Sequence, residues 1–257
     1  MVRFDGADEK DLAGRWSVPR VRLFDLVGST LDIAHELAAD GAPAGTVILA
    51  DAQYAGRGRM GRSWRSEPGA GIWLTIVERP ADAAASDVLS LRVGLAAARA
   101  LDALAGATVG LKWPNDLYLA GRKLAGVLIE ARWREGVPEW IAIGVGINVR
   151  PPRTEPNATG LPQGVGRLAA LDALVPAIRA AARKSGWLTP MELAEFETRD
   201  VARGRRCASP AVGVVAGLDE TGALLVDTDG PPAERVALRA GSLVLEASER
   251  EGEAEGL

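Results

Sequence analysis

The sequence predicts an α+β fold, in which a mixed, mostly antiparallel sheet carries helices and a smaller all-β unit follows it. In the first 150 residues, short loops and hairpins join the strand-like runs, unlike the regular strand–helix alternation of a parallel sheet. After residue 203 the pattern changes to short alternating strands separated by turns. We therefore predict a domain over residues 1–203, a second over 204–248 and a disordered acidic tail over 249–257.

The first helix of this domain is expected at residues 28–41. Ser29 or Thr30 can cap its start, and Gly41 can end it. Apolar residues recur on one face between these ends, as in an amphipathic helix. Strands are expected around it and further along, at residues 21–27, 46–51, 71–77, 108–113 and 139–149.

Residues 86–106 carry the clearest helical pattern, with Ser86 as the expected cap and Gly106 as the stop. Residues 116–133 predict a hairpin that turns at Ala120–Gly121. A loop rich in proline and glycine then leads to helices at residues 167–184 and 190–201, and to short strands at 211–218, 223–228, 234–238 and 242–247.

Composition excludes several classes of protein. The 257 residues carry a net charge of −4, which argues against a nucleic-acid coat protein. Cys207 is the single cysteine, so no internal disulfide can form, and a reducing cytoplasm is the expected compartment. Cys207 and His35 cannot supply the usual four ligands of a zinc site. No signal peptide and no apolar run of membrane-spanning length is evident, so no membrane partner is expected.

An unusual cluster of arginines and glycines lies in AGRGRMGRSW, residues 55–64. Like charges this close repel, and glycines this dense cost conformational entropy to order. Arginines bind carboxylates and phosphates through paired hydrogen bonds, so the cluster indicates an anionic ligand. A solvated flexible loop and an RNA-binding tract are the alternatives, although such tracts are usually longer.

Three further motifs combine polar residues with strands. KWPND ends a strand at Pro114 and brings Lys112, Asn115 and Asp116 together, although a plain turn also explains it. GRKLAGVLIE places Lys123 where burial begins, which indicates a charged partner or a snorkelling surface lysine. GVGINV has strand glycines and a polar Asn148, consistent with a close ligand or a structural role. Neither a catalytic triad nor a Walker loop can be identified.

These four motifs, QYAGRGRMGRSW, KWPND, GRKLAGVLIE and GVGINV, occur in one order, which together with GST near the start resembles the biotin protein ligase family. The likeness covers about residues 21–150, and the β-rich end is similar to that family's SH3-like C-terminal domain, a small β-barrel. It implies a catalytic domain related in fold to class II aminoacyl-tRNA synthetases and lipoate ligases. Some members carry an N-terminal winged helix; there is no room for one before Val21, so a ligase-only chain that binds no DNA is expected.

The resemblance also implies roles for individual residues. Lys123, Arg57 and Arg59 would stabilise the reacting anions, and two positions depart from the family pattern: Leu31 replaces a frequent Asn, and Met60 a frequent Arg. The residues implied for biotin are Ser29, Thr30, Gln53, Gly56, Arg57, Gly58, Arg59 and Lys123, and those for ATP or the adenylate are Arg62, Trp64, Asn115, Asp116, Gly126 and Asn148. Apolar walls for biotin are expected from the strands at residues 71–77 and 124–129.

The activity implied by the resemblance has two steps. Biotin and Mg²⁺-bound ATP form biotinyl-5′-AMP, and the biotinyl group then passes to a lysine of a biotin carboxyl carrier domain. No enzyme nucleophile is needed, in agreement with the absence of a recognisable one. A lipoate or other acyl-adenylate ligase on the same fold is the alternative enzyme, and an RNA-binding module is the alternative of another class. The sequence leaves the oligomeric state open, a homodimer included.

Overall fold

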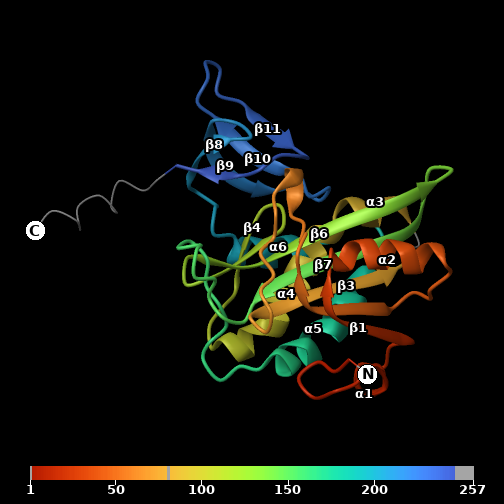
Figure 1. Cartoon of the computed structure of the whole chain (residues 1–257). Coiled ribbons are helices and arrows are strands. Elements are labelled where there is room, and N and C mark those ends of the chain that lie inside the picture. The colour runs from red at the N-terminus through yellow and green to blue at the C-terminus, as the bar shows by residue number, and fades with distance from the viewer. Residues whose placement is uncertain (1, 80–81, 247–257) are drawn as a thin grey trace, which may run out of the picture.

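The computed structural model describes residues 2–79 and 82–246, which form two sheets with helices (Figure 1). The larger sheet has seven strands in the order β1-β2-β3-β7-β6-β5-β4. β1 and β2 are parallel and the other pairs are antiparallel, so the predicted mixed, mostly antiparallel sheet is confirmed. The strands are β1 (Arg20–Val27), β2 (Thr46–Gln53), β3 (Gly71–Glu78), β4 (Gly110–Lys112), β5 (Asp116–Leu119), β6 (Arg122–Arg134) and β7 (Val137–Asn148).

Both faces of this sheet are buried. Along β2, Val47 and Leu49 join the large core cluster on one face, whereas Ile48 joins the smaller cluster on the other. This alternation follows from the two-residue period of a strand. The small cluster lies beneath α2 (Thr30–Ala39), and the large one beneath α4 (Leu89–Ala105) and α5 (Arg167–Ala182). The sheet therefore has helices on both faces, and among the described residues α2 is the helix that covers the face with the site described below.

Three further helices, α1, α3 and α6, lie around this core. α6 leads from the first sheet to the second, and Val201 N–H donates to the Leu111 carbonyl at 2.9 Å on the way. The bounds of these three helices are α1 (Glu9–Arg15), α3 (Ala83–Asp87) and α6 (Pro190–Arg199). Among the described residues, no helix is long and apolar enough to cross a membrane.

The second sheet has five antiparallel strands in the order β11-β10-β9-β8-β12. Within residues 204–246, β11 and β12 form its two edges and do not pair, so the sheet is open. Trp113, from the KWPND motif, donates its indole N–H to the Gly222 carbonyl at 3.0 Å and joins the two sheets. The strands are β8 (Arg206–Ser209), β9 (Gly213–Leu218), β10 (Leu224–Thr228), β11 (Arg235–Leu238) and β12 (Val244–Leu245).

Three local expectations need correction. The helix predicted at residues 86–106 is two helices, α3 and α4, with a break at Val88. Asp82 caps α3 through a bond from the Ala85 N–H, so the predicted cap at Ser86 is wrong. α1 and β8 were not expected, because each is short and α1 depends on a capping box that apolar periodicity does not reveal. The predicted tail at residues 249–257 lies outside the described residues.

Candidate active site

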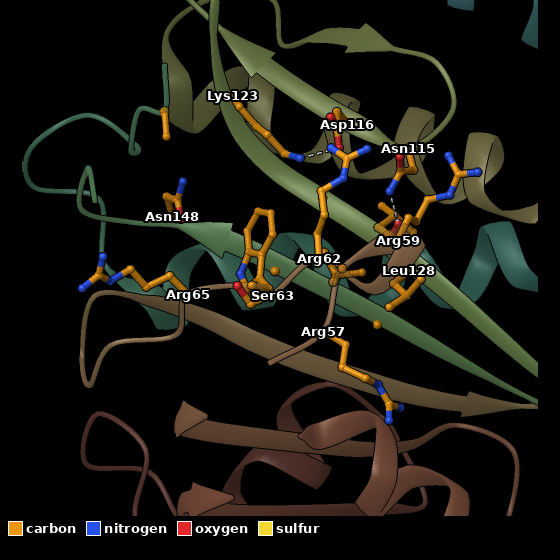
Figure 2. Close-up of a pocket in the computed structure, with 18 of the residues that line it drawn as sticks. Arg57, Arg59, Arg62, Ser63, Arg65, Asn115, Asp116, Lys123, Leu128 and Asn148 are labelled. Carbon is orange, nitrogen blue, oxygen red and sulfur yellow. Dashed lines mark hydrogen bonds and ion pairs between the residues drawn. The ribbon is translucent and has the colours of Figure 1, made fainter. Parts of the chain in front are cut away.

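A cavity of about 540 Å³ opens on the α2 side of the larger sheet, between the Arg/Gly loop (residues 54–65) and strands β6 and β7 (Figure 2). Gly56 is the one predicted site residue that does not line it. The predicted residues that do are Ser29, Thr30, Gln53, Arg57, Gly58, Arg59, Arg62, Trp64, Asn115, Asp116, Lys123, Gly126 and Asn148. Four segments that are distant in sequence thus meet at one cavity.

The Arg/Gly loop folds back on itself like a hairpin. Trp64 N–H donates to the Gly56 carbonyl at 2.8 Å, and Gly58 N–H donates to the Arg62 carbonyl at 2.7 Å. A Cβ at residue 56 would lie 2.4 Å from the Trp64 carbonyl oxygen, so this close approach requires glycine. Gly56 therefore serves the shape of the loop from behind the cavity wall.

One end of the cavity is a buried polar cluster at the start of α2. The Gln53 side-chain oxygen accepts from the Thr30 N–H at 2.8 Å and from the Thr30 hydroxyl at 3.1 Å. Thr75 donates its hydroxyl to Thr30 at 2.8 Å, and Ser29 caps the helix through the Leu31 N–H. Since these groups hold one another in place, they present fixed hydrogen-bonding atoms to a ligand.

The middle of the cavity is apolar, and the Trp64 indole lies over two strand glycines there. Gly126 of β6 and Gly146 of β7 are register partners. A Cβ at residue 146 would lie 2.4 Å from Trp64 Nε1, and one at residue 126 would lie 3.1 Å from Cζ3. Trp73 and Leu128, from the predicted apolar strands at residues 71–77 and 124–129, line the same cavity. Within the described part of the chain, Trp64 Nε1 is buried without a hydrogen-bond partner.

We expect Gly146→Ala to displace the Trp64 indole, because the strand backbone cannot yield by the required distance. Chymotrypsin should then cleave after Trp64 faster than in the unmodified protein, as followed by mass spectrometry. Gly14→Ala is the matched control, since a Cβ there meets nothing within 4 Å. Equal cleavage after Trp64 in both variants would contradict the proposed packing.

Cations gather at the other end of the cavity. Lys123 Nζ lies 2.7 Å from the Asp116 carboxylate (Figure 2). It also lies 5.2 Å from the centre of the Trp64 ring. Burial lowers the pKa of Lys112 and of Arg59, Asp116 opposes this lowering, and neighbouring cations reinforce it. Lys112, Lys123 and Arg59 interact with Asp116, and Arg62 lies near Lys112 and Arg59, so the positive charge is in excess. Such a site attracts phosphate or carboxylate groups.

Arg57 differs from the other loop arginines in direction. It donates to Asp32 at 2.5 Å and to Glu130 at 2.9 Å, and in Figure 2 it extends away from Asp116. Its charge is therefore balanced by these two carboxylates, outside the cation group around Asp116.

Two contributions to the cavity were missed in the sequence. Ser242 accepts a hydrogen bond from Arg62 at 2.6 Å, and residues 242–245 of the second sheet line the cavity wall. No local pattern could reveal this contact, because 180 residues separate the two partners. Lys112, which the resemblance does not assign to a ligand, joins the cation group around Asp116. Trp113, between Lys112 and Pro114 in the same motif, is 2% exposed and belongs to the core.

Comparison with known proteins identifies the family of this chain. Residues 23–148 match the model of the biotin/lipoate A/B protein ligase family. The chain is 33% identical to a biotin--[acetyl-CoA-carboxylase] ligase of Mycobacterium tuberculosis, with 87% of this chain and 89% of the relative aligned. It is also 33% identical to the bifunctional ligase/repressor BirA of Bacillus spizizenii, with 79% of this chain and 68% of the relative covered.

Solved structures give the same result for the fold. A point mutant of the biotin protein ligase from Aquifex aeolicus, in complex with biotin, has a TM-score of 0.71 at 25% identity, covering 89% of this chain and 98% of that one. The same enzyme with biotin and ATP has a TM-score of 0.70 at 24% identity, with 89% and 99% covered. The predicted resemblance is thereby confirmed: the chain belongs to the biotin/lipoate A/B protein ligase family and, within it, to the biotin protein ligases.

Proposed function

We propose that the chain is an ATP-dependent ligase that activates biotin as biotinyl-5′-AMP and transfers it to a lysine of a biotin carboxyl carrier domain. The observation that carries this proposal is the cavity itself, which joins a buried polar end to a cationic end through an apolar middle. Biotin has a polar ring head, an apolar chain and a carboxylate in that order. The names of the relatives and the ligands in the solved structures, which include biotin, ATP and biotinyl-5-AMP, support the same activity.

In the first step, a biotin carboxylate oxygen bonds to the α-phosphorus of ATP, the bond to the bridging oxygen breaks, and pyrophosphate leaves. Both reactants are anions, so positioning and cationic stabilisation dominate the rate. We assign Ser29, Thr30 and Gln53 to the ring head, where polar partners discriminate strongly. Arg59 and Lys123 are assigned to the carboxylate and α-phosphate, beside the backbone of Arg57 and Gly58. The nucleotide is assigned to Arg62, Trp64, Asn115, Asp116, Gly126 and Asn148.

In the second step, the amine of the acceptor lysine attacks the biotinyl carbonyl carbon, AMP leaves with the bonding electrons, and the amine loses a proton. Water would hydrolyse the same mixed anhydride. The Arg/Gly loop lies along the cavity, so we assign it the task of excluding water until the acceptor arrives. No residue of the chain becomes covalently attached to the substrate.

Mg²⁺ is expected to enter with ATP. Among the described residues, no group of three or more His, Cys, Asp or Glu side chains could hold a metal ion alone. Asp116 and Glu155 line the cavity, and a single carboxylate with the substrate's phosphates suffices for Mg²⁺. The residues present therefore fit a metal carried by the nucleotide. Asp116, which lies beside the cation group, is the expected protein ligand of that metal.

The finer architecture is also proposed. We assign residues 1–203 to the catalytic domain, with a class II synthetase-like fold, and residues 204–248 to an SH3-like domain. The five short antiparallel strands, which form a sheet separate from the seven-stranded one, support this division. A cytoplasmic location and a carrier-domain partner agree with the bacterial ligase relatives. A homodimer is retained as a proposal to be tested by sedimentation.

Pyrophosphate release from ATP, measured without any acceptor protein, tests the proposed activity. We expect release with biotin and at least tenfold less with lipoate, because a site built to hydrogen-bond a polar head rejects a ligand that lacks it. Faster release with lipoate would favour the lipoate ligase alternative. Release with neither substrate would reject adenylation as the function of the cavity.

A further inference from the structure

The side chain of Arg57 is held by a chain of hydrogen bonds that the proposed chemistry does not use. Arg57 Nη1 donates to Asp32 on α2, and Nη2 donates to Glu130 Oε2 on β6. The same Glu130 oxygen lies 3.0 Å from His35 Nε2. His35 in turn receives the Trp140 indole N–H on Nδ1 at 2.9 Å. The hydrogen bonds therefore connect the Arg/Gly loop with α2, β6 and β7, and Arg57 itself contacts α2 and β6.

Trp140 determines the tautomer of His35. An indole nitrogen can only donate, so His35 Nδ1 must accept from it. A neutral imidazole then carries its proton on Nε2, and this N–H donates to Glu130. Glu130 Oε2 is thus fixed by two donors, one from His35 and one from Arg57. The orientation of the carboxylate does not depend on Arg57 alone.

The position of Glu130 on β6 connects the orientation of its carboxylate with the cavity. Gly126, Leu128 and Glu130 follow one another at two-residue spacing on β6 and share one face. Gly126 and Leu128 line the cavity, whereas Glu130 lies at its rim beside the Arg/Gly loop. A carboxylate at this rim can hold the loop from outside without entering the ligand space.

We propose that Arg57 anchors the Arg/Gly loop through its side chain, and that Glu130, oriented by His35, is the positioning residue that receives this anchor. The guanidinium bonds outward to α2 and β6, so the backbone at Arg57 and Gly58 is held over the cavity. This role differs from the sequence expectation, in which the Arg57 guanidinium binds the reacting anions. The inference rests on the proposed function for its effect on ligands, but the anchor itself can be tested without any ligand.

The sign of the Glu130→Gln effect distinguishes the two roles of Arg57. If Glu130 anchors Arg57 and keeps the loop closed, loss of the Glu130 carboxylate weakens biotin binding. If Glu130 instead competes with the bound anion for Arg57, loss of the carboxylate tightens biotin binding. The Arg57–Glu130 contact is about one-third exposed on both sides, so solvent reduces its strength. We therefore expect about a fivefold rise in Kd for biotin.

The first experiment uses chymotrypsin on the full chain without ligand. Glu130→Gln should speed cleavage after Trp64 about fivefold, and Arg57→Gln should speed it at least as much, because it also removes the contact with Asp32. The double variant should add little to Arg57→Gln, because the Arg57–Glu130 contact is already absent there. Arg134→Gln and Glu139→Gln are matched controls, since this exposed pair at 3.7 Å lies on the β6–β7 hairpin away from the cavity. Cleavage unchanged in both single variants would overturn the anchor.

The second experiment uses the fact that the sequence contains a single histidine. ¹⁵N NMR should show His35 as the Nε2–H tautomer when neutral, and Trp140→Phe should remove this preference while keeping an aromatic ring. A dominant Nδ1–H tautomer would overturn the positioning of Glu130 by His35.

Kinetics complete the test. Glu130→Gln should raise KM for biotin about fivefold and leave kcat of pyrophosphate release within about twofold. A lower KM, or a loss confined to kcat, would reject the anchor in favour of a direct role in chemistry. If the unmodified protein releases no pyrophosphate with biotin, the proposed function fails, while the proteolysis and NMR results still decide the anchor.

Discussion

Lys123→Ala is expected to lower the rate of pyrophosphate release from biotin and ATP by roughly ten- to a hundredfold. Lys123 Nζ lies 2.7 Å from Asp116 and faces the Trp64 ring, within the cation group that we assign to the reacting anions. A hydrogen bond to a charged group contributes about 1.5–3 kcal/mol, which corresponds to that range. The loss should appear in kcat, because the charge it stabilises develops during the transfer.

A second variant separates two causes of the loss. Removing Lys123 also leaves Asp116 without its nearest cation, and that carboxylate then repels the phosphates. In Lys123→Ala combined with Asp116→Asn this repulsion is absent. If Lys123 itself stabilises the transition state, the double variant is at least as slow as the single one, because Asp116 is also assigned to the nucleotide and its metal. Recovery to the unmodified rate would assign the effect to Asp116 and reject a direct role of Lys123. Lys10→Ala, an exposed change on α1, is the control.

Local chemistry explains why much of this site could be predicted from sequence. Short apolar runs located β2, β3 and β7. Of the two caps considered for α2, Ser29 is the one observed, and the predicted stop at Gly106 is confirmed, because each depends on one residue and its neighbours. The Arg/Gly loop and Lys123 were recognised because dense charge near apolar strands needs a reason. Predictions failed where the determinant was distant or small, as for the helix break at Val88.

The direction of charged side chains was the main feature that sequence could not reveal. Arg57 and Arg59 look equivalent in AGRGRMGRSW, yet Arg57 pairs with Asp32 and Glu130, whereas Arg59 lies near Asp116. The fold brings carboxylates from α2 and β6 near Arg57, and a carboxylate from β5 near Arg59, and this determines where each guanidinium points. Ion pairs between distant segments carry no sequence pattern of their own. The same holds for Arg62 and Ser242.

Glu192→Ala is expected to lower the free energy of unfolding by about 3–5 kcal/mol, because it leaves a buried arginine without its charged partner. Arg92 of α4 is 1% exposed and donates to Glu192 at 3.2 Å, and it also donates to the carbonyls of Gly186 and Trp187. Glu192 further accepts from Lys184 and closes the capping box of α6 with Thr189. Urea unfolding measures the change. The control is Glu197→Ala: Glu197 lies on the same helix and forms an exposed ion pair with Arg203, so its loss should lower the free energy of unfolding by less than about 1 kcal/mol.

The pH dependence of this loss gives an independent check. Burial alone would raise the pKa of Glu192, but bonds from Thr189, Lys184 and Arg92 outweigh it and lower the pKa to about 2. Because this folded value lies below the value of 4.5 for the free side chain, the stabilisation is complete above about pH 4.5 and is lost as pH falls toward 2. Stability differences between the unmodified protein and Glu192→Gln should therefore shrink between pH 6 and about pH 3. A difference that is constant over this range would show that Glu192 acts through shape and capping and not through its charge.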